Sequence, residues 1–580
     1  MRHALLLLLF LASRLVGAED VAAVRTEAAR WRAERRVIDL HLHVNYTSQH
    51  LARAVKILDA VGVGLGVNLS GGRVTPAKDG GPSEFERNKA LADRLFPGRF
   101  LHYFNLDYSG WDQPDFAARA VRQAEEARRL GAAGFKEYKR LGLSLRDGQG
   151  RLIAVDDPKL DPFWRRLGEL GLPVSIHVGD PAAFWLPYDS RNERWKELKD
   201  HRSWWFGDTN QFPPRLTLLA ALDRVVARHR GTTFVGVHFA NNPEDLDWVE
   251  AALDRHPNLM ADLAARIPEL GRHDPRRVHR LFVKHQDRIL FATDFMVVHK
   301  LILGSSGDDE QPTDRDAEIF YEKEWRWLET WDRDWPHMTP IQGDWKIRSI
   351  GLPAGVLRKV YFDNARRLLA RHLPGPVLRA GRVAEDFDPD GRLAEAAWAR
   401  ATPVRVELGS ATGEARPELS TTVRALWSGR WLYLGYECPF TELTVFDTPH
   451  PEKERLGLWD RDVVEAFIGT DSSNIQRYAE YEIAPTNERL DVWCDLPRKN
   501  FAWDGRAQSA VTVDRARRVW TCEVRIPLEV LASAAPVPGT RWRLNLYRCD
   551  KANHAYLAWR PTLTGSFHTP ERFGELEFTE

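Results

Sequence analysis

The sequence predicts an α/β protein of two domains, a (β/α)8 TIM-like barrel followed by an all-β sandwich of the jelly-roll type. Three observations predict this architecture. The chain has 580 residues, several times the size of an ordinary single domain. From residue 36 to about residue 372, short aliphatic runs alternate with amphipathic helical segments. After Pro374, helical periodicity gives way to short alternating strands separated by turn signals.

Composition and charge limit the classes of function. Hydrophobic residues make up 43% and charged residues 28% of the chain, which is globular composition and excludes a mainly disordered protein. Lys+Arg and Asp+Glu are equal at 82 each, so the formal net charge is zero. Proteins that hold nucleic acid through its phosphates normally carry a basic excess, so a nucleic-acid partner is not expected.

The N-terminus has the pattern of a signal peptide over residues 1–18. Arg2 and His3 precede an apolar run at residues 4–12, and Val16-Gly17-Ala18 supplies small residues at the usual cleavage spacing. A buried N-terminal helix is the alternative. No later apolar run reaches membrane length, so the sequence predicts an exported protein without a membrane span, periplasmic or extracellular.

Eight strands and their intervening helices account for the barrel, which we place at residues 30–374. The helical patterns cover residues 82–95, 115–130, 213–228, 243–255 and 275–285, and a helix at residues 353–370 closes the domain. The expected strands are residues 37–44, 62–69, 100–106, 134–140, 173–178, 233–239, 259–263 and 289–295.

The second domain is placed at residues 383–580, after a boundary near Pro374-Gly375-Pro376, where both helix and strand are interrupted. Turn signals such as Asp-Pro-Asp-Gly at 388–391 separate its strands. The expected strands are residues 422–427, 431–436, 463–469, 478–484, 520–526 and 542–548.

Four histidines and an aspartate coincide with strand ends of the predicted barrel. His41 and His43 alternate along the first strand and therefore point the same way. His177, His238 and Asp294 follow strands five, six and eight, at the face where barrel active sites are built. Imidazoles and a carboxylate form a suitable donor set for Zn²⁺ with room for water. The alternative is that all five are polar residues that only cap strand ends.

The ordered pattern His-x-His, His, His, Asp resembles the amidohydrolase superfamily. Gly134-Phe135-Lys136, the run at residues 289–294 and Asp363-Asn364-Ala365 resemble its aminocarboxymuconate-semialdehyde-decarboxylase-like branch, also called amidohydrolase-2, over about residues 36–372. The resemblance implies a single divalent metal, with zinc as the first expectation. It implies that the ligands are His41, His43, His177 and Asp294, and that His238 stands beside the metal water.

The resemblance also implies the chemistry. Asp294 would take a proton from water and pass it to the leaving group, and His238 would orient the nucleophile or polarise the scissile carbonyl. The expected activity is hydrolysis of a small amide, ester or lactone, which includes sugar-derived compounds. The alternative is non-oxidative decarboxylation of a small carboxylic acid. Two-metal branches carry a carbamylated lysine at the end of strand four. We interpret Lys136 instead as structural or substrate-facing.

Loops above the barrel carry further candidates for substrate binding. Arg266 follows strand seven and is placed to hold a substrate carboxylate, or to form a salt bridge with Glu269. Long Trp-rich insertions follow strands five and eight, and Trp185 lies in the first. Such loops are often lids or subsites, although most of these tryptophans are expected to pack on each other or on the second domain.

The second domain resembles family-9 carbohydrate-binding modules over about residues 383–578, through residues 388–398, 460–467, 520–527 and 542–548. Trp459, Trp503 and Trp559 are candidates for stacking on a sugar, although each taken alone is more often a core residue. The alternative from another class is a non-catalytic carbohydrate-binding envelope protein whose barrel is only a scaffold. Such a scaffold would not need the five site residues of the barrel. All four cysteines lie in this domain, and export permits disulfides in any of three pairings.

Overall fold

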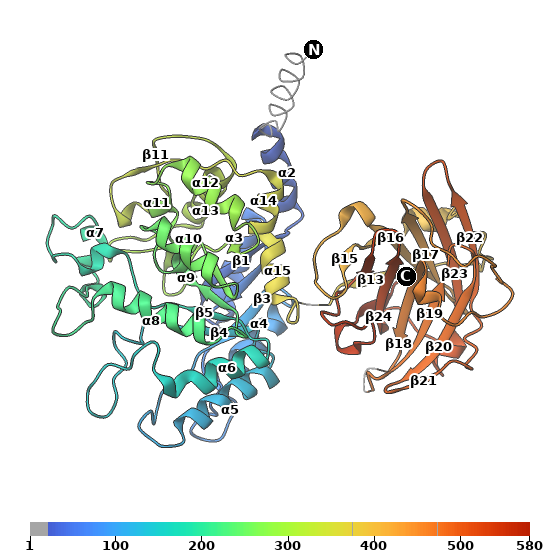
Figure 1. Ribbon diagram of the computed structural model, residues 1–580, viewed down its shortest axis with the longest axis horizontal. Helices are drawn as coiled ribbons and strands as arrows, with labels where there is room; N and C mark the ends of the chain where they lie inside the picture. The colour runs from blue at the N-terminus through green and yellow to red at the C-terminus, as the bar shows by residue number, and fades with distance from the viewer. Residues whose placement is uncertain (1–20, 374, 472–473) are drawn as a thin grey trace, which may run out of the picture. The chain divides into compact units, whose positions relative to one another are not determined.

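The computed structural model describes residues 21–373, 375–471 and 474–580, and it divides the chain into two compact units, Met1–His372 and Leu373–Glu580 (Figure 1). The expected signal peptide at residues 1–18 lies outside the described residues. Within the described ranges, no helix combines the length and the apolar character needed to cross a bilayer.

The first unit is a parallel barrel whose strands follow the order of the chain. Each strand from β1 to β7 pairs in parallel with the next, and β9 pairs with β1 to close the ring. The predicted fold class is therefore confirmed. The strands are β1 (Val37–Val44), β2 (Val63–Asn68), β3 (Phe100–Phe104), β4 (Gly134–Glu137), β5 (Val174–Ile176), β6 (Phe234–Gly236), β7 (Leu259–Asp262), β8 (Ile289–Leu290), β9 (Phe295–Val297) and β10 (Leu301–Leu303).

The eighth barrel strand is split into two pieces, which differs from the continuous strand expected at residues 289–295. β8 pairs with β7, whereas β9 pairs with β1 and carries the antiparallel β10. Between the pieces, Asp294 has a φ of 60° and its backbone N–H donates to the His41 carbonyl at 3.0 Å. The interruption therefore places Asp294 beside the first strand.

Helices surround this barrel (Figure 1). Local signals begin them: Ser83 and Glu86 form a capping box at α4, and Thr313 and Asp316 form another at α13. The expected closing helix is interrupted by a π-helical turn at Lys359–Asp363. The helices are α2 (Val21–Ala33), α3 (Ser48–Val61), α4 (Glu84–Leu95), α5 (Phe116–Arg129), α6 (Asp161–Glu169), α7 (Trp195–Leu198), α8 (Arg215–Arg228), α9 (Val237–Ala240), α10 (Leu246–Arg255), α11 (Ile267–Leu270), α12 (Pro275–Lys284), α13 (Asp314–Glu329), α14 (Ala354–Arg358) and α15 (Asn364–Leu369). A small ribbon of β11 (Trp335–Pro336) and β12 (Lys346–Ile347) follows α13.

The second unit is almost entirely β, and all six of its expected strands are present. The pairing order is β21-β20-β19-β18-β24-β26-β13-β16-β17-β23-β22, antiparallel except where β13 pairs with β16 and β26. The elements are β13 (Val377–Arg382), α16 (Ala396–Arg400), β14 (Val404–Val406), β15 (Leu408–Gly409), β16 (Thr421–Trp427), β17 (Trp431–Pro439), β18 (Val463–Gly469), β19 (Arg477–Ile483), β20 (Arg489–Asp495), β21 (Arg498–Asn500), β22 (Gln508–Asp514), β23 (Val519–Pro527), α17 (Leu528–Leu531), β24 (Arg541–Asp550), β25 (Ala555–Ala558) and β26 (Gly574–Phe578).

Two layers share the core of this unit. Alternate residues of β18, such as Val464 and Ala466, are buried in one cluster with alternate residues of β17, such as Leu432 and Leu434. Because strand residues alternate between faces, strands from the two ends of the pairing order must face each other as a sandwich. Cys438, Cys494, Cys522 and Cys549 are buried and free, so no disulfide joins them.

Candidate metal centre

Two histidines and an aspartate meet at the mouth of the barrel. The Nε2 atoms of His41 and His43 lie 3.6 and 3.5 Å from Asp294 Oδ1, and the three potential donor atoms lie within 4.8 Å of one another. Asp294 Oδ1 is buried and accepts no hydrogen bond within the described part of the chain. A buried carboxylate oxygen without a partner is costly, so this donor set fits a bound cation. Nitrogen and carboxylate donors suit zinc.

Burial keeps the histidines of this site in the form that a metal needs. It lowers the pKa of His41 and His43 well below the ordinary value, and the nearby Lys136 ammonium lowers both further. Neutral imidazoles keep a nitrogen lone pair free for coordination. Burial also raises the pKa of Asp294, although Lys136 and Arg266 oppose that rise. These two cations favour the ionised form of the Asp294 carboxyl.

Two partners that the sequence did not reveal fix the ring orientations. His41 Nδ1 lies 3.0 Å from Asp262 Oδ2, at the end of β7, and His43 Nδ1 lies 2.7 Å from Ser70 Oγ. Both contacts leave Nε2 directed toward Asp294. Carboxylates that hold metal-ligating histidines in this way set the tautomer and raise ligand basicity. Asp262 could have been suspected only because it ends a barrel strand.

His238 lies in a left-handed turn and not at the end of strand six. β6 ends at Gly236, and the four residues from His238 to Asn241 have φ values between 55° and 60°. The turn folds Ala240 back so closely that a Cβ on Gly236 would lie 2.7 Å from the Ala240 Cα. Left-handed backbone costs about 1–2 kcal/mol per residue, and such strain concentrates at functional sites.

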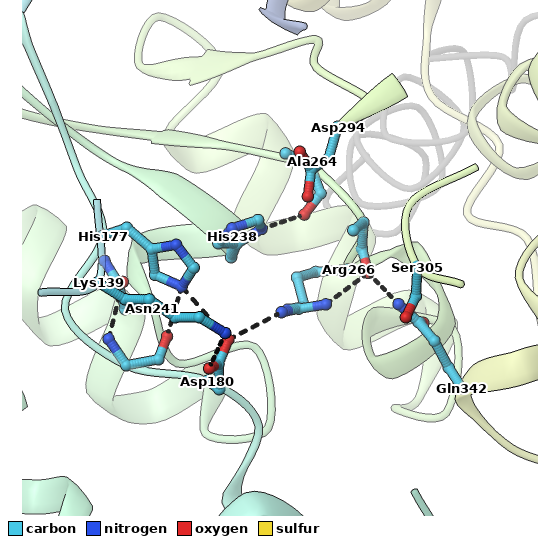
Figure 2. A network of polar contacts seen from close by, with 12 residues as sticks. Lys139, His177, Asp180, His238, Asn241, Ala264, Arg266, Asp294, Ser305 and Gln342 are labelled. Carbon is cyan, nitrogen blue, oxygen red and sulfur yellow. Dashed lines mark hydrogen bonds and ion pairs between the residues drawn. The ribbon is translucent and has the colours of Figure 1, made fainter. Parts of the chain in front are cut away.

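Two hydrogen bonds anchor the His238 side of this turn. The His238 backbone N–H donates to Asp262 Oδ1 at 2.7 Å. The His238 Nδ1–H donates to the Ala264 carbonyl at 2.7 Å (Figure 2). The carbonyl can only accept, so Nδ1 carries the proton and Nε2 keeps a lone pair. The ring centre lies 5.2 Å from that of His41. His238 thus lies next to the three-residue cluster with an unprotonated Nε2.

The fourth predicted ligand, His177, is oriented differently. Its Nε2–H donates to the Gly179 carbonyl at 3.1 Å and lies 3.4 Å from Asp180 Oδ1 (Figure 2). Its ring packs on His238 with centroids 4.3 Å apart. The structure therefore brings together His41, His43 and Asp294 and places His177 beside them, with Nε2 turned toward Asp180.

Lys136 lies against the cluster itself and is almost fully buried. Its Nζ donates to His41 Nε2 at 3.3 Å, at the nitrogen that would hold a metal. Burial lowers the Lys136 pKa, and the carboxylates of Asp262 and Asp294 partly offset that shift. Lys136 therefore contacts a candidate metal ligand directly.

The predicted carboxylate-binding arginine already has an anionic neighbour. Arg266 Nη2 lies 3.8 Å from Asp180 Oδ1, and Arg266 Nη1 donates to the Ala265 carbonyl. Glu269, the partner considered from the sequence, pairs with Arg194 instead. Lys139 also donates to Asp180 at 2.5 Å (Figure 2). Burial alone would raise the Asp180 pKa, but Lys139, His177 and Arg266 lower it well below its ordinary value, so this carboxylate stays ionised.

The predicted aromatic candidates have different surroundings. Trp185 packs on Phe206, with ring centroids 5.0 Å apart, and its indole N–H donates to the Pro213 carbonyl inside the same insertion. Trp559 is buried in the sandwich core, and Trp503 packs against that core. Trp459 is 38% exposed, so it alone of the three sandwich candidates presents much of its surface to solvent.

Comparisons with known proteins agree with this division. Residues 97–371 match the family described as amidohydrolase, and residues 390–580 match the carbohydrate family 9 binding domain-like family. An "Extracellular protein" of the fungus Arthroderma benhamiae is 26% identical over 182 residues, covering 28% of this chain and 80% of its own length.

Two solved structures are similar to the two units. A 2,6-dihydroxybenzoate decarboxylase complexed with 2,6-dihydroxybenzoate is 17% identical, covering 58% of this chain and 99% of its own, with a TM-score of 0.33. A family 9 carbohydrate-binding module of Caldicellulosiruptor kristjanssonii in complex with glucose is 16% identical, covering 35% and 96%, with a TM-score of 0.27. The chain is an amidohydrolase-2 domain fused to a domain like the family 9 carbohydrate-binding modules.

Proposed function

We propose that the barrel is a metal-dependent hydrolase of a small amide, ester or lactone, with one zinc ion held by His41, His43 and Asp294. The observation that carries this proposal is the unpartnered, buried Asp294 Oδ1 between two histidine Nε2 atoms. His177 completes the predicted ligand set once its ring turns from Asp180. A zinc ion in such a site supplies Lewis-acid polarisation and lowers the pKa of water toward neutrality.

The residues of the chain perform the remaining steps. Asp294 accepts a proton as the nucleophile forms and returns it to the leaving group. His238 Nε2 keeps a lone pair because Nδ1–H is committed to the Ala264 carbonyl. It orients the attacking water or, once protonated, polarises the scissile carbonyl.

Decarboxylation is the second candidate chemistry. A decarboxylase must hold a substrate carboxylate, and the candidate for that task, Arg266, lies in the same cluster as Asp180. The nearby Lys139 also pairs with Asp180. These pairings favour hydrolysis, because an anionic substrate would have to compete with an anion already in place.

Metal analysis followed by a substrate screen tests the proposal. Purified full-length protein should contain one equivalent of zinc, and His41→Ala should lose both the zinc and the activity. Lactones, esters, amides and aromatic carboxylates should then be compared, with water addition and CO₂ release measured separately. CO₂ release without water addition would replace hydrolysis by decarboxylation.

We further propose that the sandwich binds carbohydrate and that the protein is exported through residues 1–18. The exposed Trp459 indole, with the Phe501 ring 6.5 Å away, supports sugar stacking. Glycan pull-down with full-length protein and its Trp459→Ala variant tests the first point. N-terminal sequencing of the mature protein tests the second.

A further inference from the structure

A polar cavity of about 870 Å³ lies beside the metal centre, at the mouth of the first four barrel strands. Val44 and Asn45, which directly follow His43, form part of its wall. Ser70 and Tyr138 also line it, and both contact His43: Ser70 Oγ lies 2.7 Å from Nδ1, and the Tyr138 ring stacks at 5.8 Å between centroids. We call this cavity the β1–β4 pocket. Ser70 and Tyr138 therefore form the layer of side chains between this cavity and His43.

The wall after β2 is preformed. Gly72 donates its N–H to Asn105 Oδ1 at 3.2 Å, and its carbonyl accepts the Asn105 N–H at 3.0 Å. Asn105 also donates through its side chain to the Leu69 and Lys136 carbonyls. Gly72 has a φ of +96°, and a Cβ there would lie 2.5 Å from the Glu84 side chain. These hydrogen bonds hold the wall after β2 in place.

The two arginines along the pocket each lie beside a carboxylate. Arg140 donates through Nε and Nη2 to Glu137 Oε1 at 3.2 and 3.1 Å, and Arg73 Nη1 lies 3.9 Å from Asp107 Oδ1. Each arginine of the wall thus has a carboxylate beside it. A substrate anion would gain little from either guanidinium, because each already has a carboxylate beside it. Glu84, whose Oε2 accepts the Arg73 backbone N–H, adds a further carboxylate to the wall.

Hydrogen-bonding groups without a partner remain available in the pocket. Within the described residues, Asn88 Oδ1 and Arg140 Nη1 have no hydrogen-bond partner, and neither has the Asn45 side-chain amide. Tyr108 and Tyr138 add ring surfaces, with the Arg140 guanidinium 5.0 and 5.8 Å from their centroids. Amides and one guanidinium edge beside aromatic rings suit hydroxyl groups on a ring with apolar C–H faces.

We infer that the β1–β4 pocket binds a neutral, polyhydroxylated group, a sugar ring, as the part of the substrate that does not react. This inference rests on the proposed function, because it assigns the pocket to the substrate of the same metal centre. The volume lies within the range of about 300–1,000 Å³ typical of ligand sites, so the cavity accommodates such a ring. The hydrolysed bond then belongs to a sugar-derived lactone, ester or amide.

Calorimetric titration of the full-length, zinc-loaded protein tests this assignment. The probes are the methyl glycosides of glucose, galactose, mannose and xylose, with glucuronate and benzoate as anionic comparisons. A Trp459→Ala background reduces binding by the sandwich. At least one methyl glycoside should bind, and at least tenfold more tightly than either anion.

Variants locate the binding. Asn88→Leu blocks an amide at nearly constant volume, and Arg140→Leu removes the guanidinium; each should weaken binding at least tenfold. Arg129→Leu is the matched control, because Arg129 also donates through Nε and Nη2 to a glutamate three residues earlier, on α5. It should leave the affinity unchanged.

Zinc content measured on the same samples separates the two proposals. Absence of zinc would refute the proposed function. If the protein holds zinc, three results would overturn the pocket assignment. They are that no methyl glycoside binds, that an anion binds more tightly than the glycosides, or that Asn88→Leu leaves glycoside affinity unchanged.

Discussion

Replacing Asp262 by asparagine should weaken zinc binding without unfolding the barrel. Asp262 Oδ2 lies 3.0 Å from His41 Nδ1, while Oδ1 accepts the backbone N–H groups of His238 and Ala264 at 2.7 and 3.3 Å. Asparagine keeps one oxygen for the two backbone donors and presents an NH₂ group to His41. An NH₂ group cannot accept from Nδ1–H, so the His41 proton moves to Nε2. A protonated Nε2 cannot coordinate zinc.

The size of the effect follows from this tautomer change. Loss of a partner that orients a metal-ligating histidine typically costs about 10–100-fold in metal affinity. That range corresponds to about 1.4–2.8 kcal/mol. Because the donor atoms themselves remain, saturating zinc should restore part of the turnover. The result should therefore be a raised zinc Kd with a smaller loss of kcat at high zinc.

Competition titration with a chromophoric chelator measures the zinc Kd after metal is stripped from the protein. Asp223→Asn is the matched control, because Asp223 Oδ1 lies 2.9 Å from His256 Nε2 in a similar pair between α8 and the end of α10. Circular dichroism checks that both variants fold. An unchanged Kd in Asp262→Asn, or an equal loss in Asp223→Asn, would refute the role given to Asp262.

Three further outcomes are expected. His238→Asn should keep its zinc while kcat falls by about two to four orders of magnitude, the usual range for a general acid–base group; zinc loss would contradict this. Elemental analysis should give one zinc per chain in both the wild type and Lys136→Ala. Two zinc ions per wild-type chain, one of them lost in Lys136→Ala, would indicate that the lysine bridges two metals. Burial raises the pKa of Glu482 well above 4.5, so the native state holds a proton that the unfolded state releases. The free energy of unfolding, measured by denaturant titration, should therefore fall as pH rises above about 4.5. This fall should be shallower in Glu482→Gln and unchanged in the control Glu529→Gln, whose side chain is exposed.

The order of the barrel strands was predictable because each strand is a short apolar run with a local beginning and end. The His-x-His pair was predictable for the same reason: alternation along one strand puts His41 and His43 on one side wherever that strand lies. In the sandwich, β22 (Gln508–Asp514) was missed, because all of its residues are half-buried or exposed and their sequence lacks a clear apolar alternation.

The left-handed turn at His238 could not be predicted from local preferences. His, Phe and Ala all disfavour positive φ, so the sequence Val237-His238-Phe239-Ala240 favours a strand or a right-handed helix. The turn persists because tertiary contacts hold it: Asp262 accepts the His238 N–H, and Asn241 Oδ1 accepts the Val178 N–H at 2.9 Å. Neither partner is near in sequence.

The ion pairs of the site could not be predicted from neighbouring residues in the sequence either. They matter because they decide which charged groups are free to bind a substrate. From sequence, Arg266 had Glu269 as its natural neighbour, three residues away. In the fold, Glu269 pairs with Arg194, and Arg266 lies near Asp180, which also accepts from Lys139. A cation counted from sequence as available for a substrate carboxylate thus has a carboxylate in place. Arg140 in the β1–β4 pocket likewise has a carboxylate beside it, and this pairing supports the proposal of a neutral substrate.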